Sequence, residues 1–269
     1  METGTLYSLA IYFIAMLGIG VYGYFKSTSD LSDYMLGGRR LTPGVTALSA
    51  GASDMSGWML MGLPGAFYLS GFSEVWLAVG LTIGAYVNYL VVAPRLRVYT
   101  YVANDSITIP DFFENRFHDN SRLLRLVSAI VIIIFFTLYT SSGLVAGGTL
   151  FENAFGMNYH HGLLLTAGVV VAYTLIGGFL AVSMTDFVQG CIMFLALVLV
   201  PVTGYVILNG DTALAQESIT LAPEMFNAFH GATLLGVISL LAWGLGYFGQ
   251  PHIIVRFMAI KSAKETKQA

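Results

Sequence analysis

The feature that most limits the possible folds of this chain is a series of seven apolar stretches. They cover residues 6–25, 41–70, 72–93, 123–150, 163–182, 187–208 and 234–257. A helix crosses a bilayer with about 20 apolar residues, so each stretch is long enough to span. Backbone exposed to lipid must be helical, because no water is present to pair its polar groups. The sequence therefore predicts an all-α, polytopic membrane protein with about seven transmembrane helices.

Composition supports a lipid environment and argues against other classes of function. Charged residues make up 10% of the chain, against about 25% in soluble domains. A net charge of −3 without a basic stripe predicts no nucleic-acid partner. The single cysteine, Cys191, forms no disulfide framework, and the five histidines form no metal motif. GASDMSG lacks the spacing of a nucleophile elbow, so we expect no enzyme activity.

The basic residues predict how the chain is oriented. All twelve lysines and arginines fall in alternate connections, and the short fifth connection, around 183–186, carries none. The opposite connections carry only acids, namely Glu2, Glu74, Glu152, Asp211, Glu217 and Glu224. Because basic loops stay in the cytoplasm, the N-terminus is expected outside and residue 269 inside. The first stretch follows no basic region, so it is expected to be a span rather than a cleaved signal.

Two of the seven stretches are interrupted in the same way. The second contains five glycines, Pro43 and Pro64, and the seventh places Gly244, Gly246, Gly249 and Pro251 within eight residues. Paired broken spans are typical of a transporter's binding site, because they free backbone groups for ions and carboxylates. Since the two spans are five apart, each could begin a five-helix repeat, the second inverted. The alternative is that both breaks are packing kinks.

One acid, Asp54, lies deep in an apolar stretch. An acid at the centre of a span costs about 2.5–3.5 kcal/mol, so it is a functional candidate. It is surrounded by hydroxyls in Ala-Gly-Ala-Ser-Asp-Met-Ser-Gly, which suits a small cation such as sodium. The alternative is that Asp54 caps the second half of the broken helix.

Other polar and aromatic residues are weaker candidates. Arg39 and Arg40 could snorkel at the end of the second span, and Asp186 could be the N-cap of the sixth span. Trp243 and Tyr247 lie one turn apart and could line a pocket or simply pack in the core. Tyr139 is equally ambiguous.

Three long motifs reveal a family resemblance. LGGRRLTPGVTALSAGASDMSGWMLMGLPGAFYLSG, IGGFLAVSMTDFVQ and WGLGYFGQPHIIVRFMA resemble the sodium/solute symporter family, and its bacterial proline-transporting members most closely. The resemblance extends over essentially the whole chain. It implies a LeuT-like inverted-repeat core preceded by one extra N-terminal helix, in a bacterial plasma membrane. It also implies sodium as the coupling ion, L-proline as the substrate and no other cofactor. No obligatory protein partner is evident.

Matching positions carry implied roles. The resemblance assigns sodium binding to the carbonyls of Ala52 and Met55 with Asp54 nearby, and the ion or substrate path to Ser53, Ser56, Trp58 and Gly62. It assigns the substrate pocket to Tyr139, Trp243, Tyr247 and Pro251, and coupling to Arg39 and Asp186.

The length departs from the family, whose members are about twice as long. Residues 1–269 are therefore expected to be the N-terminal part of one transporter domain, holding the first repeat and the start of the second. The remaining sodium ligands would lie in the missing half, so this part should not transport by itself. Two alternatives stay open: a sodium symporter for another solute, such as pantothenate or a sugar, and a transporter-like sensor that feeds a membrane kinase.

Overall fold

The protein is seen in a computed structural model that describes residues 3–26, 29–208 and 213–269. Two of the acids used for orientation, Glu2 and Asp211, lie outside the described residues. The regular structure is helical, and the described part holds one isolated parallel bridge, between Leu41 and Ile260. The predicted all-α fold class is therefore confirmed.

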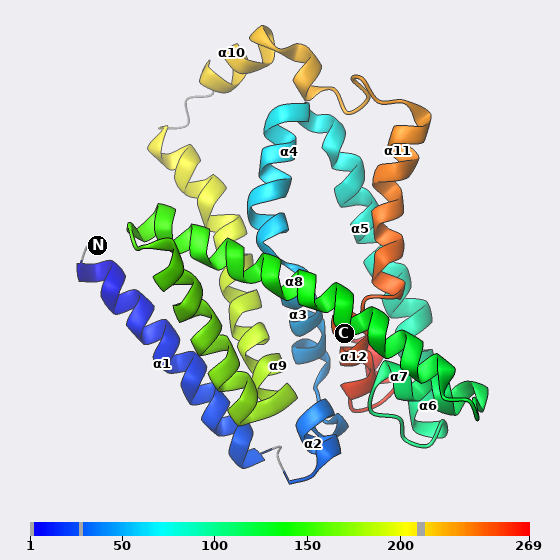
Figure 1. Ribbon diagram of the computed structural model, residues 1–269. Coiled ribbons are helices and arrows are strands. Elements are labelled where there is room, and N and C mark those ends of the chain that lie inside the picture. The colour runs from blue at the N-terminus through cyan, green and yellow to red at the C-terminus, as the bar shows by residue number, and fades with distance from the viewer. Residues whose placement is uncertain (1–2, 27–28, 209–212) are drawn as a thin grey trace.

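The elements follow one another as Figure 1 labels them. They are α1 (Thr3–Lys26), α2 (Leu31–Leu36), η1 (Gly37–Arg39), α3 (Pro43–Asp54), η2 (Trp58–Gly62), α4 (Leu63–Ser70), η3 (Gly71–Glu74), α5 (Val75–Val87), η4 (Asn88–Val92), α6 (Ala93–Val102), α7 (Ile109–Phe117), α8 (Leu123–Phe155), α9 (Tyr159–Ile207), α10 (Ala213–Leu221), η5 (Pro223–Phe226), α11 (Leu234–Leu241), η6 (Ala242–Phe248), α12 (Pro251–Ala259) and η7 (Glu265–Lys267). Of the short elements, η2 and η4 are π-helical and the others are 3₁₀-helical.

Four helical stretches of the described residues could cross a membrane by length and composition. They are Leu6–Lys26, Trp58–Val102, Leu123–Phe155 and Tyr159–Ile207. A fifth is possible if Leu234–Phe248 and Pro251–Ala259, which are bent by 43°, form one span. Two of the four are much longer than one crossing needs, and each contains a sharp break. All seven apolar segments are thus mainly helical, while their number of crossings stays a prediction.

Two glycines make these breaks. Gly71 (φ 71°, ψ −156°) joins α4 to η3 and α5, and Gly178 (φ 58°, ψ −153°) folds α9 back on itself (Figure 1). Both conformations are ones that glycine adopts readily and other residues avoid. A Cβ atom on Gly178 would also lie 2.7 Å from the Tyr34 carbonyl oxygen. The turn in α9 therefore depends on glycine.

The position of this turn corrects the predicted connection at 183–186. Those four residues lie inside α9, and the chain turns earlier, at Gly178. The N-cap role suggested for Asp186 is therefore wrong, because the residue lies eight positions into the second arm. The two consecutive glycines at 177 and 178 were the local signal of the turn.

The sequence spaces Gly80 and Gly84, and Gly143 and Gly147, four residues apart, which predicts two ridges of small residues where neighbouring helices approach closely. A Cβ on Gly80 would lie 2.6 Å from Leu241 Cα, and one on Gly84 would lie 2.5 Å from Gly244 Cα. The second predicted pair behaves differently: Gly147 packs against Thr166, whereas no heavy atom lies within 4 Å of a Cβ built on Gly143. The first ridge is therefore confirmed, and the second is confirmed only at Gly147.

The most deeply buried helix is α12. Phe257, Met258, Ala259 and Ile260 are all 0% exposed, and they pack on residues of α2, α3 and α6. The bridge strengthens this core, since Leu41 N donates to Ala259 O and Lys261 N donates to Leu41 O. Since α12 is the second half of the broken seventh stretch, this half is fixed firmly.

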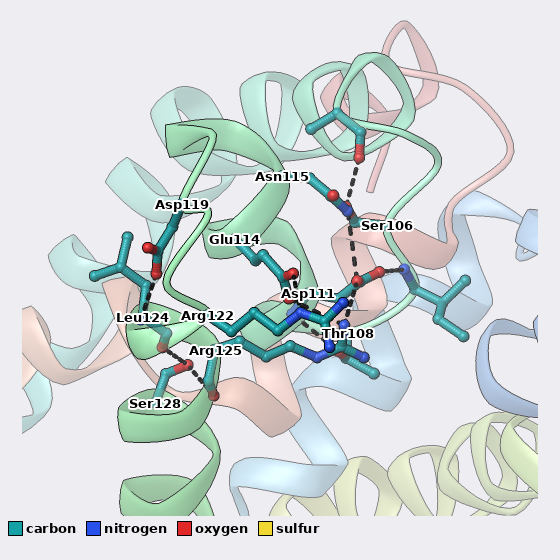
Figure 2. Close-up of polar contacts among 12 residues, drawn as sticks. Ser106, Thr108, Asp111, Glu114, Asn115, Asp119, Arg122, Leu124, Arg125 and Ser128 are labelled. Carbon is teal, nitrogen blue, oxygen red and sulfur yellow. Dashed lines mark hydrogen bonds and ion pairs between the residues drawn. The ribbon is translucent and has the colours of Figure 1, made fainter.

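Charged side chains fix α7 to the start of α8 (Figure 2). Arg125 contacts Glu114 at 3.0 Å and Asp111 at 3.6 Å. Asp119 accepts hydrogen bonds from the Ser121 hydroxyl and from the backbone N–H of Leu124, which lies in the first turn of α8. The bond from Ser121 is the main cause that lowers the pKa of the Asp119 carboxyl.

Candidate functional site

The second apolar stretch is broken next to Asp54. Helix α3 ends at that residue, Met55 has non-helical angles (φ −71°, ψ 84°), and the helix resumes as the π-helical turn η2. The last carbonyls of a helix have no donor from a following turn. Ala52 and Met55 lie at this end, where their carbonyl oxygens are available to a cation. The predicted break is confirmed, and the sodium site stays a prediction.

The seventh stretch is broken as well. Helix α11 tightens into the 3₁₀-helix η6, the chain leaves the helix at Gly249 and Gln250, and α12 begins at Pro251. Proline at the first position of a helix is favourable, because its missing N–H would be unpaired there anyway. The two broken helices lie against each other through α12 and α3.

The expectation that Trp243 and Tyr247 lie one turn apart is wrong, because the segment that carries them is 3₁₀-helical. A 3₁₀-helix has three residues per turn, so residues four apart do not lie on one face of η6. Pro251 comes after the break and lines an apolar cavity of about 490 Å³ between α12, α7 and α8. The three residues therefore have different surroundings.

Two of these residues nevertheless contact the other broken helix. The Trp243 ring stacks on the Trp58 ring, with centroids 4.9 Å apart and planes at 21°. The Tyr247 hydroxyl donates a hydrogen bond of 2.5 Å to Asp54 Oδ2. In the described residues Asp54 makes no capping bond to the second half-helix; the residue before η2 is Gly57, which has no side-chain cap. Asp54 thus connects the two breaks.

A third helix reaches the same place. From α8, the Tyr139 hydroxyl donates to the Ser53 carbonyl oxygen at 3.1 Å, and its ring stacks on His252 at 5.2 Å. Ser56 has a local role, since its hydroxyl accepts from Trp58 N at 3.3 Å. Gly62 leaves room for the Trp58 ring, because a Cβ there would lie 2.9 Å from Trp58 Cδ1.

Asp186 forms a buried ion pair that the sequence did not predict. Its Oδ2 atom lies 2.8 Å from Arg256 Nη2 and accepts from the hydroxyls of Ser49 (2.7 Å) and Ser53 (3.1 Å). Arg256 also donates from Nε to Ser49 Oγ and lies over the Phe179 ring. Asp54 is therefore not the only acid deep in an apolar segment. Arg256, the one charge within 234–257, was the available signal, but it had been assigned to the connection that follows.

Arg39 is buried rather than snorkelling. Its side chain is 8% exposed and pairs with Asp105 at 2.9 Å, while Arg40 is 70% exposed. Arg39 Nη1 also donates to Met258 O at 2.7 Å, and Nη2 donates to Ser106 O at 2.9 Å. It therefore fixes the end of α12 to the connection after α6. The two residues assigned to coupling, Arg39 and Asp186, thus both contact α12, and neither lies in a helix break.

An all-α bundle whose two interrupted helices meet at a half-buried carboxylate is the architecture of a membrane transporter. The model of the sodium:solute symporter family matches residues 34–269. The chain belongs to this family.

Curated relatives and a solved structure agree with that membership. The chain is 63% identical over 269 residues to the osmoregulated proline transporter OpuE of Bacillus subtilis, covering 100% of this chain and 54% of that protein. It is 59% identical over 260 residues to sodium/proline symporter 2 of Staphylococcus saprophyticus, covering 97% and 51%. The fold matches a Na⁺-coupled sialic acid symporter in a substrate-bound outward-open state, with a TM-score of 0.80, 20% identity and coverage of 97% and 55%. The fold is therefore LeuT-like, and the chain spans about half the length of the curated relatives it matches.

Proposed function

We propose that the full-length protein carrying this chain is a secondary active transporter that couples sodium entry to L-proline uptake by alternating access. The observation that carries the proposal is the 2.5 Å hydrogen bond from Tyr247 to Asp54, which connects the two helix breaks. The names of the relatives that are 63% and 59% identical support proline as the solute. The assigned role is transport, not catalysis.

Sodium would bind at the end of α3, to the carbonyls of Ala52 and Met55 beside Asp54. A sodium ion near the carboxylate would compete with the Tyr247 hydroxyl for its negative charge. Sodium binding would then release Tyr247, which lies on the broken helix assigned to the substrate. By linkage, proline that draws Tyr247 away from Asp54 would raise the affinity for sodium. Sodium and proline would thus each raise the affinity of the protein for the other.

The proposed location is a bacterial plasma membrane with the N-terminus outside and residue 269 in the cytoplasm. Inward movement of each sodium charge then gains about 2.3 kcal/mol per 100 mV of membrane potential. Lipid is the remaining expected partner.

The test is uptake of labelled proline by vesicles that contain the full-length protein. An imposed sodium gradient should drive accumulation, and excess unlabelled pantothenate or sugar should not compete. Competition by either solute would instead favour a different sodium symporter. Proline binding without accumulation would favour the sensor.

A further inference from the structure

One stripe on α5 and η4 faces the 3₁₀-helix η6. Gly80 and Gly84 lie against Leu241 and Gly244, and the next residue at the same spacing, Asn88, contacts Tyr247. From one contact to the next, the stripe advances by four residues, while the facing segment 241–247 advances by three. Four residues of α-helix rise about 6 Å, and three residues of 3₁₀-helix rise about 6 Å as well. The two segments run parallel and stay in register over three contacts because η6 is 3₁₀-helical.

Asn88 is the polar member of this stripe. It is 1% exposed, and its Nδ2 donates a hydrogen bond of 2.9 Å to the Tyr247 carbonyl oxygen. A buried amide in an apolar segment costs free energy unless it is hydrogen-bonded. Its position at the start of the π-helical turn η4 is notable, because such turns often occur at functional sites.

The Tyr247 carbonyl needs a donor because of the proline that follows. In an α-helix, the carbonyl of residue 247 accepts from the N–H of residue 251, and Pro251 has none. The neighbouring N–H of Gln250 is directed to Gly246 O instead, at 3.2 Å. The Asn88 amide thus replaces the N–H that Pro251 removes.

We propose that Asn88 is a positioning residue for the ion and solute site. It holds the Tyr247 backbone at the break, and the Tyr247 side chain holds its hydroxyl on Asp54. Asn88 contacts neither of the proposed ligands and acts through Tyr247. The inference rests on the proposed function, in that the affinity it controls is the affinity for sodium and proline.

A double-mutant cycle in the full-length protein tests whether Asn88 acts through Tyr247. Asn88→Leu keeps the volume and removes the donor, and Tyr247→Phe removes the hydroxyl. Each change should lower the sodium concentration for half-maximal proline uptake by about tenfold, because sodium no longer has to displace a hydrogen bond to the charged Asp54 carboxylate. The double variant should show about the same tenfold decrease, because both changes remove one interaction. A decrease of about a hundredfold would mean independent effects and would overturn the proposal.

Thr46→Val is the matched control. Thr46 is 0% exposed on α3, and its hydroxyl has no partner in the described residues. This variant should leave sodium dependence unchanged, so a change equal to that of Asn88→Leu would point to general disturbance of the core. If Asn88→Leu does not reach the membrane, Asn88→Ser replaces it in the same double-mutant cycle.

The unfolding temperature of the purified proteins gives a reading that needs no transport. Tyr247→Phe should lower it less in the Asn88→Leu background than in the wild type. Equal decreases would overturn the inference even if proline were not the solute. Failure of the wild type to take up proline with sodium would count against the proposed function alone.

Discussion

The buried pair of Arg256 and Asp186 allows a quantitative prediction about stability. The two side chains are 6% and 11% exposed, and their atoms approach to 2.8 Å. Two unit charges at this distance attract with about 6 kcal/mol at an effective dielectric constant of about 20, before desolvation is subtracted. Removing one partner leaves an uncompensated buried charge, which costs about 3–5 kcal/mol. Arg256→Leu and Asp186→Leu should each lower the free energy of unfolding by that amount.

The double variant separates the charge from the packing. With both charges gone, no ion remains buried, and replacement of a buried pair by apolar residues is often nearly neutral. The double variant should therefore be more stable than either single variant. Unfolding is measured by tryptophan fluorescence of the purified full-length protein during titration with a denaturing detergent. Arg40→Leu is the control, because that exposed residue should contribute at most about 1 kcal/mol.

Two outcomes would refute this reasoning. If the losses of the single variants add up in the double variant, the side chains stabilise the protein independently and the ion pair is not the cause. If either single variant is as stable as the wild type, the pair is broken in the prevailing state of the protein. The second outcome would mean that the ion pair forms only in a conformation that the protein occupies part of the time.

Four further predictions concern orientation, the site and the α7–α8 connection. A cysteine in place of Glu74 should react with an impermeant reagent on intact cells and one in place of Arg97 should not; labelling of the latter would reverse the proposed orientation. Asp54→Asn should raise the sodium concentration for half-maximal uptake at least about tenfold, since a charge in a pocket of low dielectric constant is lost; an unchanged sodium dependence would leave Asp54 a structural role only. Trp243→Ala removes an aromatic stack and should weaken proline affinity more than sodium affinity, measured by uptake per protein in the membrane; intact proline affinity would exclude it from the solute site. Asp119→Asn should lower the unfolding temperature at pH 7, and the difference from the wild type should vanish as pH falls through the lowered pKa of this carboxyl. A carboxyl whose pKa is lowered in the folded protein stabilises it only while the carboxyl is ionised. A difference that persists in acid would show that the negative charge of Asp119 is not the cause.

Both helix breaks could be predicted because their causes are local. Glycine and proline disfavour a helix wherever they stand, so the clusters around Asp54 and Pro251 were enough to locate the interruptions. The turn at Gly178 was missed although its cause, the pair of glycines at 177 and 178, is local as well. These glycines lie in an apolar run without polar turn residues, whereas the polar residues within 183–186 are typical of a connection between spans. In a membrane helix such hydroxyls can bond to the preceding turn, as Ser183 does to Phe179 O at 2.9 Å.

The pairing of side chains across helices could not be predicted, because it depends on the register between helices. Asp186 and Arg256 are 70 positions apart, and Asp54 and Tyr247 are 193 apart. The expectation that Trp243 and Tyr247 lie one turn apart did not hold either. A spacing of four residues matches one turn only in an α-helix, whereas residues 242–248 form a 3₁₀-helix.

Asn88 shows that some long-range contacts still have a readable pattern. A proline in a helical segment removes a known donor, and so identifies the carbonyl four residues earlier as unpaired. In a membrane, water cannot supply the missing bond, so a buried polar side chain must. The candidates are few, because apolar segments contain few amides, and a glycine stripe selects the helix that can come close enough. Pro251, the Tyr247 carbonyl and an asparagine four residues beyond Gly84 satisfy all three conditions. The same conditions can be applied to any broken span whose partner helix carries small residues at a spacing of four.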